Sequence, residues 1–272
     1  MSNRVRQLVV SLATAAVVLA SGAGPVRAQQ ITMDGSTGML PLATDLVQAF
    51  KAKGSTTTVD VGKGSSGASA MRAVADGRLS LGLSSDLPGE AERAAGLKGI
   101  EIARAAIVFA VHSSVSVPGL TTQQLCDIYG RKVKNWKEVG GSDMPILPLT
   151  RPVDEFDPTI IKKNNPCFKE ADGVLILPKA GDMAKALASK PGAIGMINIT
   201  YVETSQGASR SLFLNGVAPT AENVQSGAYP LFRRFFFVSK GEPAGATAQF
   251  VAFVKSADGE RVIRNTKAIP VK

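Results

Sequence analysis

Three short loops rich in glycine, serine and threonine could bind an anion. They span residues 35–38, 62–67 and 84–86, and each follows a segment with the pattern of a β-strand. The backbone N–H groups at a helix start lack partners within the helix and lie at the positive end of its dipole. Glycine lets the backbone approach a ligand, and hydroxyl groups add further hydrogen bonds. The residues that we predict for this anion site are Ser36, Thr37, Gly38, Ser65, Ser66, Ser85 and Asp86.

Each of these loops taken alone has a second interpretation. Serine and threonine are common helix N-caps, and glycine is common in turns. Three such loops at one edge of the same predicted sheet favour the binding role, because ligands of open α/β sheets bind at the carboxyl ends of the strands.

Arg151 is the charged residue best suited to bind such an anion. It follows a predicted strand at residues 145–149, and a guanidinium can hold an oxyanion through two parallel hydrogen bonds. The alternative is an arginine at the surface that pairs with Asp154 or Asp157.

The residues that enzymes and metal sites require are scarce. The single histidine, His112, stands beside Ser113 and Ser114, but neighbours in an extended strand point to opposite faces and do not form a nucleophile–base pair. A hinge or packing role is expected for His112, and a packing role for Trp136. With one histidine and two cysteines, we expect no metal site, no cofactor and no enzymatic activity.

The elements that must position the loops alternate between strand and helix. Strand patterns occur at 31–33, 56–61 and 79–83. Between the first two, Ala43, Leu46, Val47 and Phe50 recur at i, i+3, i+4 and i+7, which is one face of a helix. This order predicts an α/β fold with a mainly parallel sheet.

Two long apolar segments divide this pattern. Residues 100–111 and 230–239 could cross between two lobes and serve as a two-strand hinge. Between them lies a second α/β unit, with a helix near 121–129, a strand at 145–149, a helix near 182–188 and a strand at 193–199. A further helix is expected at 246–254. We therefore predict one lobe from residues 29–111 plus 231–272, a second lobe from residues 112–230, and a ligand between them.

The N-terminus has the features of a secretory signal peptide. Arg4 and Arg6 precede an apolar run at 8–20, and Val26-Arg27-Ala28 fits a small-x-small cleavage site. We expect residues 1–28 to be removed and the mature chain to be soluble in the periplasm. A retained anchor is the alternative, although the run is short for a bilayer span.

Charge and cysteine content describe the exported chain further. The formal net charge of the whole chain is +9. Three arginines leave with the predicted signal peptide, and the positive charge that remains favours anionic partners. The positive residues are scattered without interleaved aromatics, which argues against nucleic acid. Cys126 and Cys167 are an even pair in an oxidising compartment and predict one disulfide, the alternative being two separate buried thiols.

Nearly the whole mature sequence resembles the periplasmic phosphate-binding proteins of ABC transporters. The motifs that carry the resemblance are Gly35-Ser36-Thr37, Pro41-Leu42-Ala43, Gly64-Ser65-Ser66-Gly67, Gly82-Leu83-Ser84-Ser85, Leu120-Thr121, Asp127-Ile128-Tyr129, Asn135-Trp136-Lys137-Glu138-Val139-Gly140-Gly141, Gly192-Ala193-Ile194-Gly195 and the segment 230–241. The resemblance implies a type II periplasmic-binding-protein fold and delivery of the solute to an ABC permease in the cytoplasmic membrane. We also expect a monomer. It also implies ligand contacts from Thr37, Gly38, Ser65, Ser85 and Arg151. In some relatives a carboxylate one position before Asp86 accepts the proton of hydrogen phosphate.

The stretch that follows Arg151 departs from this family. Its members usually carry a Ser-Gly-Thr loop there, whereas this chain has residues 152–158, with a proline that lacks an N–H and the carboxylates Asp154, Glu155 and Asp157. Asp154 and Glu155 would then form a secondary ligand loop. The loop could turn outward, or Lys162 and Lys163 could neutralise it.

The sequence is compatible with three functions of the protein. The first is a binding protein for phosphate or a related oxyanion. The second is a binding protein for a different organic or partly cationic solute, and the third is a ligand-sensing protein that docks on a receptor.

Overall fold

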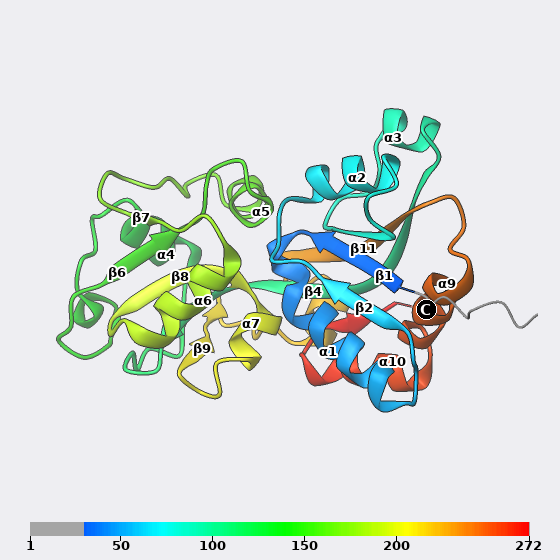
Figure 1. The fold of residues 1–272 in the computed structure, drawn as a ribbon. Coiled ribbons are helices and arrows are strands. Elements are labelled where there is room, and N and C mark those ends of the chain that lie inside the picture. Colours follow the sequence, from blue (N-terminus) through cyan, green and yellow to red (C-terminus); the bar gives the residue numbers. More distant parts are fainter. Residues whose placement is uncertain (1–29, 272) are drawn as a thin grey trace, which may run out of the picture.

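The computed structural model describes residues 30–271. The signal peptide predicted over residues 1–28 lies outside the described residues and stays a prediction. No helix between residues 30 and 271 has the length and hydropathy needed to cross a membrane. Figure 1 shows two groups of elements side by side, with the long strand β4 (Leu97–His112) passing between them. We refer to these groups as the first and second lobes.

The first lobe combines both ends of the described chain. Its strands are β1 (Gln30–Gly35), β2 (Thr58–Val61), β3 (Leu81–Ser84), β11 (Phe232–Lys240) and β12 (Ile269–Pro270). Its helices are η1 (Thr37–Met39), α1 (Leu40–Ala52), α2 (Gly67–Ala75), α3 (Glu90–Ala94), α9 (Gly245–Val254) and α10 (Ala257–Asn265). In Figure 1 these elements are blue, cyan, orange and red.

The second lobe is built from the middle of the chain. Its strands are β5 (Gly119–Leu120), β6 (Leu147–Thr150), β7 (Leu175–Ile176), β8 (Ala193–Asn198), β9 (Ser209–Ser211) and β10 (Phe213–Leu214). Its helices are α4 (Thr122–Tyr129), η2 (Trp136–Val139), α5 (Phe156–Asn164), α6 (Ala180–Ser189), α7 (Ile199–Glu203) and α8 (Ala221–Ser226). These are the green and yellow elements of Figure 1.

One sheet runs through both lobes, in the order β2-β1-β3-β11-β4-β8-β6-β7. Residues 97–106 of β4 pair with β11 of the first lobe, and residues 107–111 pair with β8 of the second. β4 and β11 are the strands formed by the two long apolar runs; β4 pairs with strands of both lobes, whereas β11 pairs with β3 and with the first-lobe part of β4. The prediction of a mainly parallel sheet is wrong at its centre, because β11 runs antiparallel to both β3 and β4, and β4 runs antiparallel to β8. Chain segments that leave and return between the lobes must run in opposite directions.

The predicted helix face of α1 packs against the core of the first lobe. Ala43, Leu46, Val47 and Phe50 are all buried, as their spacing predicted. The Phe50 ring lies 5.2 Å from the Phe250 ring of α9, in an edge-on arrangement. This packing fixes the carboxyl end of β1 relative to the start of α1, where the first candidate loop lies.

The second lobe has its own aromatic core. The Tyr129 ring lies 4.6 Å from Phe168, and its hydroxyl donates a hydrogen bond of 3.0 Å to the Leu149 carbonyl oxygen. The indole N–H of buried Trp136 donates to the carbonyl oxygen of Gly192 at 3.0 Å. The packing role predicted for Trp136 is confirmed.

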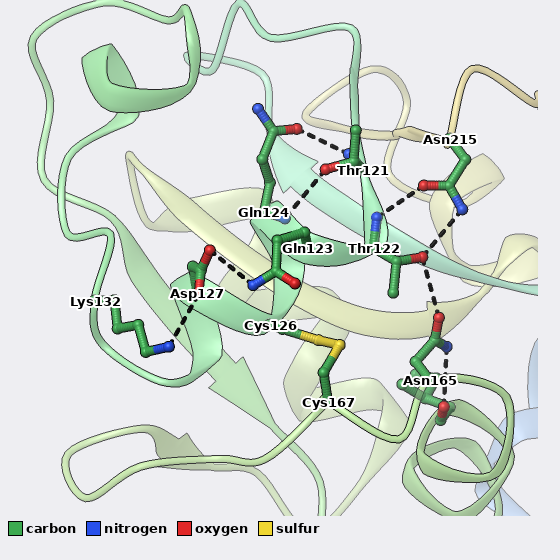
Figure 2. Close-up of a disulfide and its surroundings, with 11 residues drawn as sticks. Thr121, Thr122, Gln123, Gln124, Cys126, Asp127, Lys132, Asn165, Cys167 and Asn215 are labelled. Atoms are coloured by element: carbon green, nitrogen blue, oxygen red, sulfur yellow. Dashed lines mark hydrogen bonds and ion pairs between the residues drawn. A yellow bond between two sulfur atoms is a disulfide. The ribbon is translucent and has the colours of Figure 1, made fainter.

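Cys126 and Cys167 form the predicted disulfide. Figure 2 shows Cys126 on α4 bonded to Cys167, which lies in the segment after α5. Thr122 at the start of α4 supports the same junction, since its hydroxyl donates to the Asn165 side-chain oxygen at 3.2 Å. The disulfide joins two residues of the second lobe that are 41 positions apart in the sequence.

Replacing both cysteines by alanine should lower the free energy of unfolding by about 3 kcal/mol, because the unfolded chain regains the freedom of a long loop. Urea unfolding of the oxidised protein and of the double variant measures the difference. A reducing agent should destabilise the natural protein and leave the variant unaffected. Equal unfolding midpoints for the two proteins would contradict this prediction.

Candidate functional site

The three predicted loops converge at the carboxyl ends of β1, β2 and β3. The backbone N–H of Ser36 donates to the Leu83 carbonyl oxygen, and that of Ser65 donates to the Gly35 carbonyl oxygen, both at 2.8 Å. The Asp34 carboxylate accepts a hydrogen bond of 2.9 Å from the Gly64 N–H. Gly35 has a φ of 141°, and a Cβ atom there would lie 2.2 Å from the Leu83 carbonyl oxygen, so only glycine fits.

These loops form one wall of a cavity of about 300 Å³. The residues that line the cavity are Ser36, Thr37, Ser65, Ser66, Gly67, Ala68, Ser85, Asp86, Asp154, Glu155, Phe156 and Arg233. All the serine, threonine and aspartate residues predicted from the first-lobe loops are therefore brought together. Gly38 is buried but is not among the lining residues.

Arg233 supplies the positive charge of this cavity, and none of the sequence motifs had indicated it. It lies on β11 and is only 4% exposed. Its Nε donates to the Ser85 hydroxyl at 3.0 Å, and one terminal nitrogen lies 3.4 Å from the Ser36 hydroxyl. The other terminal nitrogen lies 3.1 Å from Asp157 Oδ1 of the second lobe, an ion pair whose angle is not that of a hydrogen bond. A charged residue within the apolar segment 230–239 was the signal available in the sequence, since charges are almost never fully buried unless paired.

Arg151 occupies a different place from the one predicted. Its side chain is 3% exposed, and Nη2 pairs with Glu155 Oε2 at 3.0 Å. It does not line the cavity that holds the three loops, but a second one of about 410 Å³. The alternative of a surface arginine paired with Asp154 or Asp157 is wrong, because Arg151 is buried and its partner is Glu155.

The acidic segment after Arg151 forms the second-lobe wall of the cavity. Asp154, Glu155 and Phe156 all line it, so the loop does not turn outward. Lys162 does not neutralise this loop, because it pairs with Glu170 at 2.9 Å. Two arginines pair with carboxylates of this segment instead: Arg151 pairs with Glu155, and Arg233 pairs with Asp157.

Two side chains of the second lobe also donate hydrogen bonds to the backbone of the first loop. The Tyr201 hydroxyl donates a hydrogen bond of 2.6 Å to the Thr37 carbonyl oxygen, and the Asn198 amide donates one of 3.0 Å to the Gly38 carbonyl oxygen. Burial raises the pKa of Tyr201 to about 12, a rise that the nearby charges of Arg151 and Arg233 partly oppose. Loop residues 37–38 thus join the two lobes.

Other sites of chemistry are sparse in the part of the chain that the structure describes. No three histidine, cysteine, aspartate or glutamate side chains gather there closely enough to hold a metal ion. His112 ends β4, where its Nδ1 lies 2.8 Å from the Ser114 hydroxyl. It does not line the cavity.

Comparisons with known proteins agree with this architecture. A family model described as a PBP superfamily domain matches residues 20–258. The chain belongs to the PBP superfamily. This family consists of solute-binding proteins of transporters and is not a family of enzymes.

Several relatives resemble this PBP over most of their length. It is 28% identical to the phosphate-binding protein PstS of Bacillus subtilis, over 89% of this chain and 80% of the relative. It is also 28% identical to the protein SphX of Synechococcus elongatus, over 82% of this chain and 72% of the relative.

Solved structures extend the likeness to the fold. A putative phosphate ABC transporter substrate-binding protein from Clostridium perfringens, with bound phosphate, has a TM-score of 0.76 and 28% identity, covering 90% of this chain and all of the other. An ABC-type phosphate transport receptor from Vibrio cholerae, at 24% identity and a TM-score of 0.62, covers 88% of this chain and 99% of the other and shows the fold alone. The predicted periplasmic-binding-protein fold is confirmed.

Gly38→Ala should destabilise the protein by about 1–3 kcal/mol, because overpacking forces buried groups apart. The added Cβ would lie 2.2 Å from Arg233 Nη1, which Ser85 and Asp157 hold in place. Gly181→Ala is the matched control, because its Cβ on helix α6 would meet no atom within 4 Å. Urea unfolding that finds the two variants equally stable would contradict the packing of Gly38 on Arg233.

Tyr201→Phe should flatten the loss of stability at alkaline pH. The folded protein keeps the Tyr201 proton up to a pKa of about 12, whereas an unfolded tyrosine loses it near pH 10. The stability that this group contributes is complete below pH 10 and is lost as the pH rises toward 12, at up to about 1.4 kcal/mol per pH unit. Denaturant unfolding at pH 8, 10 and 11 measures the difference between natural protein and variant, and a constant difference would refute it.

Proposed function

We propose that this PBP is an exported binding protein that captures phosphate or a related small oxyanion and delivers it to an ABC permease. The observation that carries the proposal is the cavity between the lobes. There, Ser36, Ser65 and Ser85 line the same cavity as buried Arg233. Oxyanions are bound by such sets of hydroxyl and N–H donors around a guanidinium.

The relatives support this ligand class. The Bacillus subtilis relative is named as a phosphate-binding protein, and the Clostridium perfringens structure contains phosphate. The chain spans at least four fifths of both the Bacillus subtilis protein and the Clostridium perfringens structure, so the likeness includes both lobes.

The remaining parts of the proposal follow from the sequence. Residues 1–28 would be cleaved on export to the periplasm, and residues 29–111 plus 231–272 and residues 112–230 would act as the two lobes. The protein would act as a monomer, without cofactor or enzymatic activity.

The proposed site residues divide by role. Ser36, Thr37, Ser65, Ser66, Ser85 and Arg233 would bind the anion from the first lobe. Asp86, Asp154 and Glu155 would limit which anions enter, because like charges at short range repel. Gly38 and Arg151 would act indirectly, Gly38 by admitting Arg233 and Arg151 by neutralising Glu155.

Closure would complete the site. The contacts from Tyr201 and Asn198 to the first loop join the lobes, and two neutral hydrogen bonds contribute only about 1 kcal/mol each. Such weak links can break and re-form as the solute enters and leaves, so the bound solute and the Arg233–Asp157 ion pair together would decide which state is populated.

Isothermal titration of the ligand-free protein with phosphate, arsenate, sulfate and small organic phosphates tests this function. Binding of at least one of them is expected, and Ser65→Ala should weaken it about tenfold through loss of a hydrogen bond to the charged group. Ser189→Ala is the control, because that serine lies at the end of α6 and bonds its own helix. No heat and no thermal shift with any of these anions would contradict the proposed function.

A further inference from the structure

Two carboxylates on the wall of the cavity have no cationic partner. Asp86 and Asp154 both line it and both are exposed to it. Among residues 30–271, neither carboxylate lies within ion-pair distance of a lysine, arginine or histidine. Both are therefore free to bind a cationic group of a ligand.

The positive charges near the cavity are already balanced. Arg233 faces Asp157 at 3.1 Å, and Arg151 faces Glu155 at 3.0 Å. The cavity therefore carries an excess of negative charge, although its first-lobe wall is rich in neutral hydroxyl donors. An inorganic dianion would gain hydrogen bonds from that wall and be repelled by Asp86 of the first lobe and Asp154 of the second.

The cavity is also larger than a bare oxyanion needs. Its volume of about 300 Å³ lies at the lower end of small-molecule sites, and a water molecule takes only about 30 Å³ of liquid. Phe156 adds an aromatic side chain to the second-lobe wall, next to Asp154 and Glu155. The space between the donor wall and the carboxylates can hold a short carbon chain.

We propose that the preferred solute is a small zwitterion in which a phosphonate or phosphate head is joined by a short carbon chain to a protonated amine. The head binds the hydroxyl groups of Ser36, Ser65 and Ser85 beside Arg233. The amine binds Asp154 and Asp86. This inference rests on the proposed function, since it assigns the ligand class of the same site.

Titration with three probes at neutral pH tests the inference. The probes are 2-aminoethylphosphonate, ethylphosphonate, which lacks the amine, and inorganic phosphate. The amine-bearing probe should bind at least tenfold more tightly than either of the others. Its advantage over ethylphosphonate should shrink as salt is added, because charge attraction at an open cavity is screened.

Two variants connect that preference to the carboxylates. Asp154→Asn and Asp86→Asn should each reduce the advantage of 2-aminoethylphosphonate over ethylphosphonate at least threefold, and binding of ethylphosphonate should stay equal or tighten. Asp172→Asn is the matched control, because this exposed second-lobe aspartate lines a different cavity. It should leave the ratio unchanged.

The outcomes separate this inference from the proposed function. If inorganic phosphate or ethylphosphonate binds as tightly as the amine-bearing probe, the zwitterion is excluded and the oxyanion function stands. If the amine preference persists in the variant that lacks both Asp86 and Asp154, the assignment of these carboxylates is wrong. If no phosphorus-containing probe binds, this inference fails; the proposed function fails with it only if arsenate and sulfate also give no heat.

Discussion

The site depends on one buried guanidinium at the boundary between the lobes. Arg233 lies on β11. Its guanidinium donates hydrogen bonds to the hydroxyl groups of Ser85 and Ser36 in the first lobe and forms an ion pair with Asp157 of the second lobe. A charge that is 4% exposed is stable only where it is paired and hydrogen-bonded, so each of these partners is required. The glycine at position 38 leaves the space that this side chain occupies.

The same interaction links binding to the relative position of the lobes. Arg233 lies on β11 of the first lobe, whereas Asp157 lies in the first turn of α5 in the second lobe. Separating the lobes would leave two buried charges without partners, unless water or a solute replaced them. The ion pair therefore favours the closed arrangement, in which Tyr201 and Asn198 also reach the first loop.

The acidic segment 152–158 changes the character of an otherwise anion-binding cavity. Glu155 pairs with Arg151, and Asp157 pairs with Arg233. These carboxylates of the protein itself therefore balance the arginine charges that a bound anion would otherwise neutralise. The hydroxyl groups of Ser36, Ser65 and Ser85 remain on the cavity wall, whereas the Ser66 hydroxyl caps α2 and donates to Ser69. A cavity that combines neutral donors with free carboxylates selects by the charge distribution of a solute and not by its net charge alone.

Local patterns in the sequence determined the elements, the three loops and the disulfide. The spacing of apolar residues predicted α1, and the glycine and serine runs after β1, β2 and β3 identified most of the first-lobe wall, because the carboxyl ends of parallel strands meet at one edge. Which arginine faces the cavity was decided by the tertiary structure alone. Arg233 and Arg234 are neighbours on β11 and point to opposite faces, so Arg234 pairs with Glu101 while Arg233 enters the site. Only the register of β11 against β3 and β4 fixes which face is which, and that register comes from pairings distant in the sequence.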